Sequence, residues 1–233
     1  MVLYTPGRTS SYPDEPVDSG IRIHFLGGGN EVGNVGVVLE DQTATRLLID
    51  YGLAPSRPPR YPSEAPPIGD AIFTHTHIDH IGMAPWLVGN HDTNLHGTTL
   101  TAALSGMMWK DTYKVSSIEG YPLPWDRRDE DYAKDAWETH PYGKWTQHDN
   151  WRWQLHSAGH VPGAAMVEIE TPTHRILHTG DLDTRDSPNT RGAKPVECDI
   201  LLLESTYAGK EHPDRAQEEA RFLAKVVEVV ERG

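Results

Sequence analysis

Residues 74–82 concentrate side chains that can bind metal ions. The segment reads Thr-His-Thr-His-Ile-Asp-His-Ile-Gly and follows a short apolar run. If the preceding strand continues through it, His75 and His77 point to one side, while Asp79 and His80 reach a second point where the chain turns. Imidazole and carboxylate together suit zinc, and four such groups from one turn indicate two metals sharing a site. The alternatives are a histidine-rich solvated turn and core histidines bonded to backbone groups, and this spacing after an apolar strand disfavours both.

Two later segments supply further possible ligands at strand ends. Residues 151–160 alternate bulky apolar with polar side chains and then break at glycines, which places His160 where backbone can approach a site closely. Residues 175–181 again run from an apolar strand into glycine and a carboxylate. Asp181 is therefore the candidate bridge between two metals. Taken singly, each would be an ordinary loop residue, but after the first motif and in this order they complete a ligand set.

These motifs, together with Asp50 ahead of them, resemble the metallo-β-lactamase fold. Three further stretches resemble its β-CASP nuclease branch: the glycine-rich residues 27–33, residues 158–164 around His160, and the Leu-Glu-Ser-Thr-Tyr stretch at 203–207. The last is similar to the acidic motif with which β-CASP proteins open an inserted second domain. The resemblance extends from residue 21 to the C-terminus and is strongest to archaeal and eukaryotic cleavage-and-polyadenylation nucleases and archaeal exonucleases.

The resemblance implies an α/β fold of layered αββα type with two zinc ions and a phosphodiesterase that cuts RNA. In that fold His75, His77 and His160 hold one zinc, Asp79 and His80 the other, and Asp181 bridges them. Asp50 then orients a metal-bound histidine, and Glu204 orients the acid that protonates the leaving group. The expected catalytic residues are Asp79, Asp181 and Glu204, and no substrate-binding residues are assigned.

The resemblance also predicts the domain organisation: a flexible leader over 1–20, a metallo-β-lactamase-like domain over 21–204, and the start of a β-CASP domain over 205–233. The resemblance implies two further histidine motifs later in the chain. In β-CASP nucleases one of them completes the ligand shell of the second metal, and the other supplies the acid that protonates the leaving group. After Glu204 the only histidine is His212, and no strand leads into it. We therefore expect a missing C-terminal half and incomplete or weak activity. An apolar stripe at three-to-four spacing predicts a helix after Pro213.

Composition limits the class of protein. The net charge is −13, with 34 acidic residues and only 7 lysines beside 14 arginines. Such a surface is unfavourable for phosphate binding at low salt but suits a salt-adapted protein, in which repulsion is screened within about 3 Å at 1 M salt. The alternative is an acidic protein of a mesophile. There is no apolar run of 18 residues and no signal peptide, so we expect no membrane association and a cytoplasmic location. The single cysteine, Cys198, is expected to be a buried thiol.

The rest of the chain supplies the scaffold. Strands are expected over 21–26, 35–40, 46–50 and 200–203, and helices over 83–91 and 98–115. Residues 54–69 contain six prolines and should form a loop. Residues 118–145 are expected to be helix-rich cover whose tryptophans pack. The other histidines have no ligand spacing and are expected to be ordinary, with His178 the one of interest: His24, His91, His96, His140, His148, His156, His174, His178 and His212.

Three functions remain open from the sequence. The first is a β-CASP ribonuclease, cutting internally or from an end, as a homodimer or in a nuclease complex. The second is a metal-dependent hydrolase of a small thioester, ester or lactam, against which the Glu-Ser-Thr-Tyr motif argues. The third is a non-catalytic subunit of a nuclease complex, against which the complete set of ligands in the first half argues.

Overall fold

Two β-sheets and five helices make up the part of the chain that the structure describes. The structure is a computed structural model that describes residues 12, 13 and 15–233. The first sheet has the spatial order β1 (Ile21–Gly27), β2 (Gly36–Asp41), β3 (Arg46–Tyr51), β4 (Asp70–Ile72), β5 (Asn94–Gly97) and β6 (Trp137–Thr139). The second has the order β11 (Ile200–Leu202), β10 (Arg175–His178), β9 (Ala165–Glu170), β8 (Trp151–Ser157) and β7 (Thr146–His148).

The strand directions change within each sheet. In the first sheet β1, β2 and β3 are antiparallel, whereas β3 to β6 are parallel. In the second, β7 to β10 are antiparallel and β11 joins β10 in parallel. Parallel neighbours bring their carboxyl ends to one edge. Polar residues follow closely there: Thr74 and His75 come after Phe73 at the end of β4, and Thr179 comes directly after β10.

The two sheets face each other across an apolar core. Val37, Leu39 and Ile49 of the first sheet pack with Trp153 and Val167 of the second, and all five side chains are at most 1% exposed. Side chains alternate along a strand, so the intervening residues of β2 and β3 face the other way and are buried beneath the helices. Burial on both faces explains why the middle of each strand, residues 37–39 and 47–49, is a continuous apolar run.

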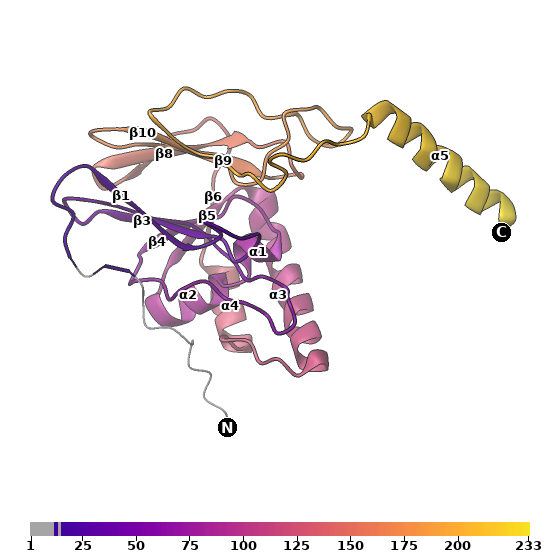
Figure 1. Cartoon of the computed structure of the whole chain (residues 1–233). Coiled ribbons are helices and arrows are strands. Elements are labelled where there is room, and N and C mark those ends of the chain that lie inside the picture. The colour runs from indigo at the N-terminus through magenta and orange to yellow at the C-terminus, as the bar shows by residue number, and fades with distance from the viewer. Residues whose placement is uncertain (1–11, 14) are drawn as a thin grey trace.

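Helices cover the other face of the first sheet (Figure 1). They are α1 (Ile78–Ile81), α2 (Ala84–His91), α3 (Thr99–Glu119) and α4 (Arg127–Asp135). The indole of Trp109 in α3 donates to the carbonyl of Ile81, and that of Trp125 donates to the carbonyl of Gly82. Packing roles for the tryptophans of this region were expected, and Trp125 fulfils that expectation with 4% exposure.

The last helix, α5 (Arg215–Arg232), projects away from both sheets and has no buried residue (Figure 1). The α/β class with two layered sheets is confirmed, although no helix of the described residues lies over the outer face of the second sheet. The boundary expected near residue 205 stays a prediction. Across the described residues, no helix combines the length and the apolar character needed to span a bilayer.

The structure differs from the sequence predictions at Tyr12, at the strand before the histidines and at Cys198. The expected leader falls largely on residues 1–11 and 14, which lie outside the described part, whereas Tyr12 is buried and its hydroxyl donates to Glu40. The strand before the metal-ligand motif ends at Ile72, so it does not continue through the histidines. Cys198 is half-buried rather than fully buried.

Candidate metal centre

Backbone hydrogen bonds from residues next to the ends of β2 and β3 fix the segment that carries the histidines. After β4 the chain turns directly into α1, so Asp79 and His80 lie in the first turn of a helix instead of on a strand. The carbonyl of Asp79 accepts from Val35 N at 2.9 Å, and that of Ile78 accepts from Leu53 N at 3.1 Å. Gly52 packs so closely against this turn that a Cβ there would overlap the carbonyl of Asp79. The backbone of the turn is therefore held against the ends of the strands of the first sheet.

Three imidazoles and one carboxylate converge at the first point of the site. His75 Nε2 lies 3.0 Å from His77 Nδ1, which lies 3.2 Å from His160 Nε2. Asp181 Oδ2 is 3.8 Å from His75 Nε2 and 3.6 Å from His160 Nε2. These atoms come from the segment after β4, the segment after β8 and the segment after β10, as the strand-end reasoning anticipated.

The other oxygen of Asp181 faces the second point. Its Oδ1 lies 3.3 Å from His80 Nε2, and Asp79 Oδ2 lies 3.9 Å from that same nitrogen. The carboxylate of Asp181 thus stands between the two groups, with one oxygen toward each. All six residues expected from the sequence to bind metal are brought together.

Asp50 lies behind both groups and is fully buried. Its Oδ2 accepts from His80 Nδ1 at 2.7 Å and from Thr74 Oγ1 at 2.8 Å, and its Oδ1 accepts from Thr74 N at 2.8 Å. Since the Thr74 hydroxyl proton is directed to Asp50, its oxygen accepts from His75 Nδ1 at 3.0 Å. Asp50 thereby orients Nε2 of both His75 and His80 toward the site, and Thr74, which the sequence reasoning missed, relays its effect to His75.

The electrostatics favour metal-binding protonation states for His75, His77 and Asp181, whereas metal-free His80 is protonated at neutral pH. Burial lowers the pKa of His75 well below its ordinary value, and burial likewise lowers the pKa of His77. Burial by itself lowers the pKa of His80, but the carboxylates of Asp50 and Asp181 outweigh it and raise this pKa to about 10. Burial alone raises the pKa of Asp181, but the neighbouring His80, His75 and His160 outweigh it and hold the pKa below its usual range. Neutral imidazoles and an ionised carboxylate are the forms that bind metal, so His80 would release its proton on binding a metal ion.

The donor set fits a pair of zinc-class ions. Ligand bonds of about 2.0–2.1 Å in a tetrahedral shell place neighbouring donor atoms roughly 3.3 Å apart, close to the separations within the His75, His77 and His160 group. Three imidazole nitrogens and one carboxylate oxygen meet at this point, and these four atoms do not carry enough protons to give each of them a hydrogen bond. His75, His77, His160 and Asp181 therefore form a group that could hold a metal ion.

A cleft of about 640 Å³ opens over the second group. Asp79, His80 and Asp181 line it, as do the glycine-rich residues 27–33 and the segment 201–206. Glu204 reaches this cleft and accepts from Thr206 N at 3.0 Å, while its own N–H donates to Thr179 Oγ1. His178 lines the same cleft, where burial lowers its pKa. Glu204 thus shares a cavity with the expected ligands, whereas His212 does not line it.

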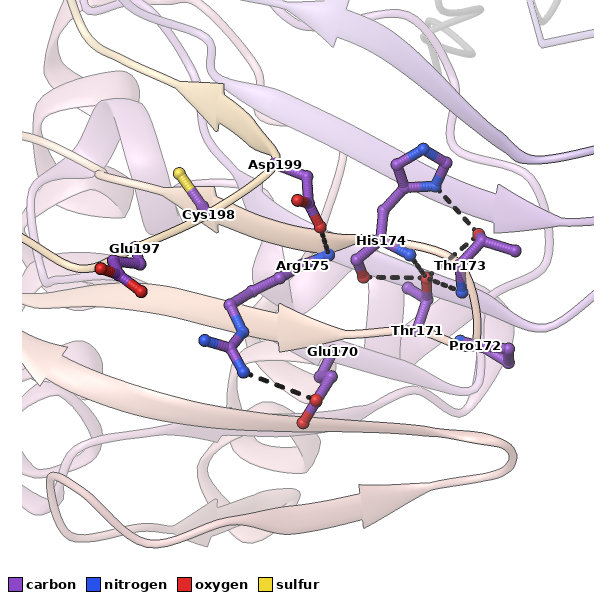
Figure 2. A pocket seen from close by; sticks show the side chains of 9 residues that line it. All are labelled: Glu170, Thr171, Pro172, Thr173, His174, Arg175, Glu197, Cys198 and Asp199. Carbon is purple, nitrogen blue, oxygen red and sulfur yellow. Dashed lines mark hydrogen bonds and ion pairs between the residues drawn. The ribbon is translucent and has the colours of Figure 1, made fainter.

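A second concave region lies at the turn between β9 and β10 and is shown in Figure 2. Three of its charged groups are already paired: Arg175 contacts Glu170 and Glu168, and Asp199 accepts from the backbone N–H of Arg175. Thr171 accepts from the backbone N–H groups of the turn. This region offers no convergent free donors, so the cleft beside Asp181 is the functional candidate.

A further group of possible ligands was missed by the sequence reasoning. His96, Glu138 and His140 place three ligand atoms within 4.8 Å of one another. His96 and His140 were expected to be ordinary histidines because they are far apart in the chain. The Glu-x-His spacing at 138–140 was the available signal, since alternate residues of an extended segment share a face.

Comparison with known proteins agrees with this geometry. The sequence profile of the metallo-beta-lactamase superfamily matches residues 28–196. The chain is 30% identical over 222 residues to "RNase aCSPSF2" of Saccharolobus solfataricus, covering 91% of this chain and 44% of that protein. It is 34% identical over 230 residues to "Cleavage and polyadenylation specificity factor subunit 3" of Dictyostelium discoideum, covering 92% and 29%. It is 30% identical over 222 residues to "Probable RNase MJ4" of Methanocaldococcus jannaschii, covering 91% and 52%.

The chain spans about half or less of the length of these relatives. Among solved structures, a protein of unknown function from Enterococcus faecalis V583 superimposes with a TM-score of 0.54 at 14% identity, covering 83% of this chain and 52% of that one. That likeness concerns the fold alone.

Proposed function

We propose, from the premise that this chain belongs to the metallo-beta-lactamase superfamily and to its β-CASP nuclease branch, that it forms the metal-binding part of a zinc-dependent phosphodiesterase acting on RNA. The observation that carries the proposal is the position of Asp181, with one carboxylate oxygen toward His75 and His160 and the other toward His80. A bridging carboxylate between two ligand groups suits hydrolysis of a phosphodiester, whose oxygens need two neighbouring cations.

The proposed roles follow from the contacts. His75, His77 and His160 would hold one zinc, Asp79 and His80 the other, and Asp181 would bridge. Two zinc ions at such a site supply a nucleophilic water of lowered pKa and neutralise charge on the phosphoryl oxygens. The protein's own part is to hold the ligands rigidly: Asp50 fixes His80 directly and His75 through Thr74.

Glu204 is proposed as the third catalytic residue, because it lies in the cleft beside the bridging carboxylate. Its carboxylate accepts from Thr206 N, which holds it at the start of the segment after β11. In that position it would orient the group that protonates the leaving oxygen. The names of the relatives speak of ribonucleases and of subunits of a cleavage and polyadenylation factor, and they support an RNA substrate and membership of a processing complex.

The test is cleavage of end-labelled RNA by the zinc-loaded chain at high and low salt, with His77→Ala as the inactive variant. His174→Ala is the matched control, because His174 lies at the turn shown in Figure 2 and outside the cleft. Cleavage abolished by the first substitution and retained in the second supports the proposal, and fragment lengths separate internal from terminal cutting. Hydrolysis of a thioester or lactam panel without any RNA cleavage would instead favour a small-molecule hydrolase. Full zinc loading without any hydrolysis would favour a non-catalytic subunit.

A further inference from the structure

A second set of metal-ligand side chains lies at the edge of the first sheet. His96 belongs to β5 and Glu138 to β6, and the two are direct partners in the parallel pairing of these strands. His140 follows two residues after Glu138, so the three side chains share one face of the sheet. This face is directed toward the second sheet, because both imidazoles contact the ring of Trp153 with centroids 5.5 and 4.6 Å away.

The ligand atoms form a compact triangle. His96 Nδ1 lies 3.1 Å from His140 Nε2, and oxygens of Glu138 lie 3.9 Å from each of these nitrogens. A tetrahedral zinc shell with bonds of about 2.0–2.2 Å requires donor separations of roughly 3.3 Å. Small side-chain adjustments within this triangle would meet that requirement. Two histidines, one carboxylate and an open fourth position form a donor set that zinc-class cations accept.

A second layer of contacts orients both imidazoles. The Asp70 carboxylate accepts from His96 Nε2 at 2.8 Å, which leaves the His96 Nδ1 lone pair facing the triangle. On the far side of His140, Nδ1 lies 3.1 Å from Thr146 Oγ1 and can donate to it, which leaves Nε2 with a lone pair as well. A carboxylate bonded to the outer nitrogen of a ligand histidine is the arrangement found behind protein-bound metals.

Without a cation the same groups can form a hydrogen-bonded chain in which Thr146 donates to His140 and His140 donates to His96. Glu138 takes no part in this series of hydrogen bonds. Yet the only ion-pair contacts that Glu138 makes among the described residues are to these two imidazoles. The Glu138 side chain is 67% exposed and the two imidazoles are 8% exposed, so a cation could enter from solvent on the Glu138 side.

We propose that His96, Glu138 and His140 form an additional binding site for a divalent cation of the zinc class. It shares no residue with the Asp181 centre. Its ligands come from β5, β6 and the residue after β6, whereas the ligands of the Asp181 centre come from the segments after β4, β8 and β10. A cation there joins β5 and β6 to the segment leading into β7, and so ties the edge of the first sheet to the second.

The experiment measures zinc or cobalt bound per chain, by elemental analysis and by cobalt absorption titration, in the full chain and in three variants. Glu138→Ala is the deciding variant because its exposed side chain can be removed without disturbing the fold. His140→Ala removes a buried ligand, and Asp70→Asn weakens its support. Glu197→Ala, at an acidic residue beside the pocket in Figure 2, is the matched control.

We expect the unsubstituted chain and Glu197→Ala to bind one more cation per chain than Glu138→Ala or His140→Ala. Asp70→Asn should keep the site with an affinity reduced about 10- to 100-fold. The same difference of one cation should persist when each substitution is combined with His77→Ala, which separates this site from the Asp181 centre. Equal cation content in the unsubstituted chain and in folded Glu138→Ala would overturn the proposal.

Discussion

Replacing Asp50 by asparagine tests whether a buried carboxylate behind the metal centre controls it. Asp50 has a positive φ of 56°, a backbone conformation that asparagine adopts with little strain, so the substitution changes the side chain alone. Asparagine can still accept from Thr74 N, but its amide group cannot accept from His80 Nδ1. Asp50→Asn therefore loses the buried, charged hydrogen bond between His80 Nδ1 and Asp50 Oδ2, which is 2.7 Å long in the structure.

A charged hydrogen bond of this kind contributes about 1.5–3 kcal/mol. We therefore expect the free energy of unfolding of the chelated chain to fall by about that amount. Because His80 and, through Thr74, His75 lose their orientation, zinc affinity should fall about 10- to 100-fold. The assays are urea denaturation with a chelator present and competition for zinc against a chromogenic chelator.

Asp92→Asn is the matched control, since Asp92 has nearly the same φ of 55° but is exposed at the end of α2. It should change neither quantity by more than about 0.5 kcal/mol. If Asp50→Asn behaves like Asp92→Asn in both assays, the role assigned to Asp50 is wrong.

Three further predictions concern the scaffold and its protonation. Gly52→Ala should unfold the chain or abolish zinc binding, because the new Cβ overlaps the carbonyl of Asp79, whereas Gly69→Ala, which meets no atom within 4 Å, should leave zinc content unchanged. Trp109→Phe should lower the free energy of unfolding by about 2–4 kcal/mol, because it leaves a cavity and an unpaired Ile81 carbonyl. Trp145 is half-exposed, so Trp145→Phe should lower the free energy of unfolding by less than about 1 kcal/mol. Equal denaturation midpoints for the two variants would contradict this prediction. The pKa of His80 is raised from 6.5 to about 10 in the folded state, so its protonation stabilises the chelated chain fully below pH 6.5, and this stability is lost as the pH rises toward 10. Urea midpoints of the chelated chain should therefore fall between pH 7 and 10, and they should fall less in His80→Gln; identical profiles would refute the assignment.

Local patterns allowed much of the candidate site to be predicted from the sequence. The His-x-His-x-Asp-His motif and the strand-end positions of His160 and Asp181 depend on neighbouring residues, and the structure brings them together. The expected ranges for β1, β2, β3, α2 and α3 agree with the structure within about four residues because apolar periodicity is a local property, whereas no strand was predicted at β5 or β6.

Features that depend on the tertiary arrangement were not predicted. Thr74 acquires its role only because Asp50 packs behind it. His96 and Glu138 meet through a pairing between two short strands 42 residues apart, and no local pattern specifies that pairing. For residues 118–145 the sequence predicted only a helix-rich segment covering one face of a sheet, without the bounds of any helix. Asp126 and Asp129 nevertheless form a capping box that marks the start of α4.

The most direct test of the central claim is the location of zinc in crystals of the chain, by diffraction on both sides of the zinc absorption edge. The proposed centre predicts two anomalous peaks about 3.5–4 Å apart. One should be bounded by His75, His77 and His160, the other by Asp79 and His80, and Asp181 should contact both. A single peak that Asp181 does not contact, or zinc bound only elsewhere in zinc-saturated crystals, would contradict the two-metal centre.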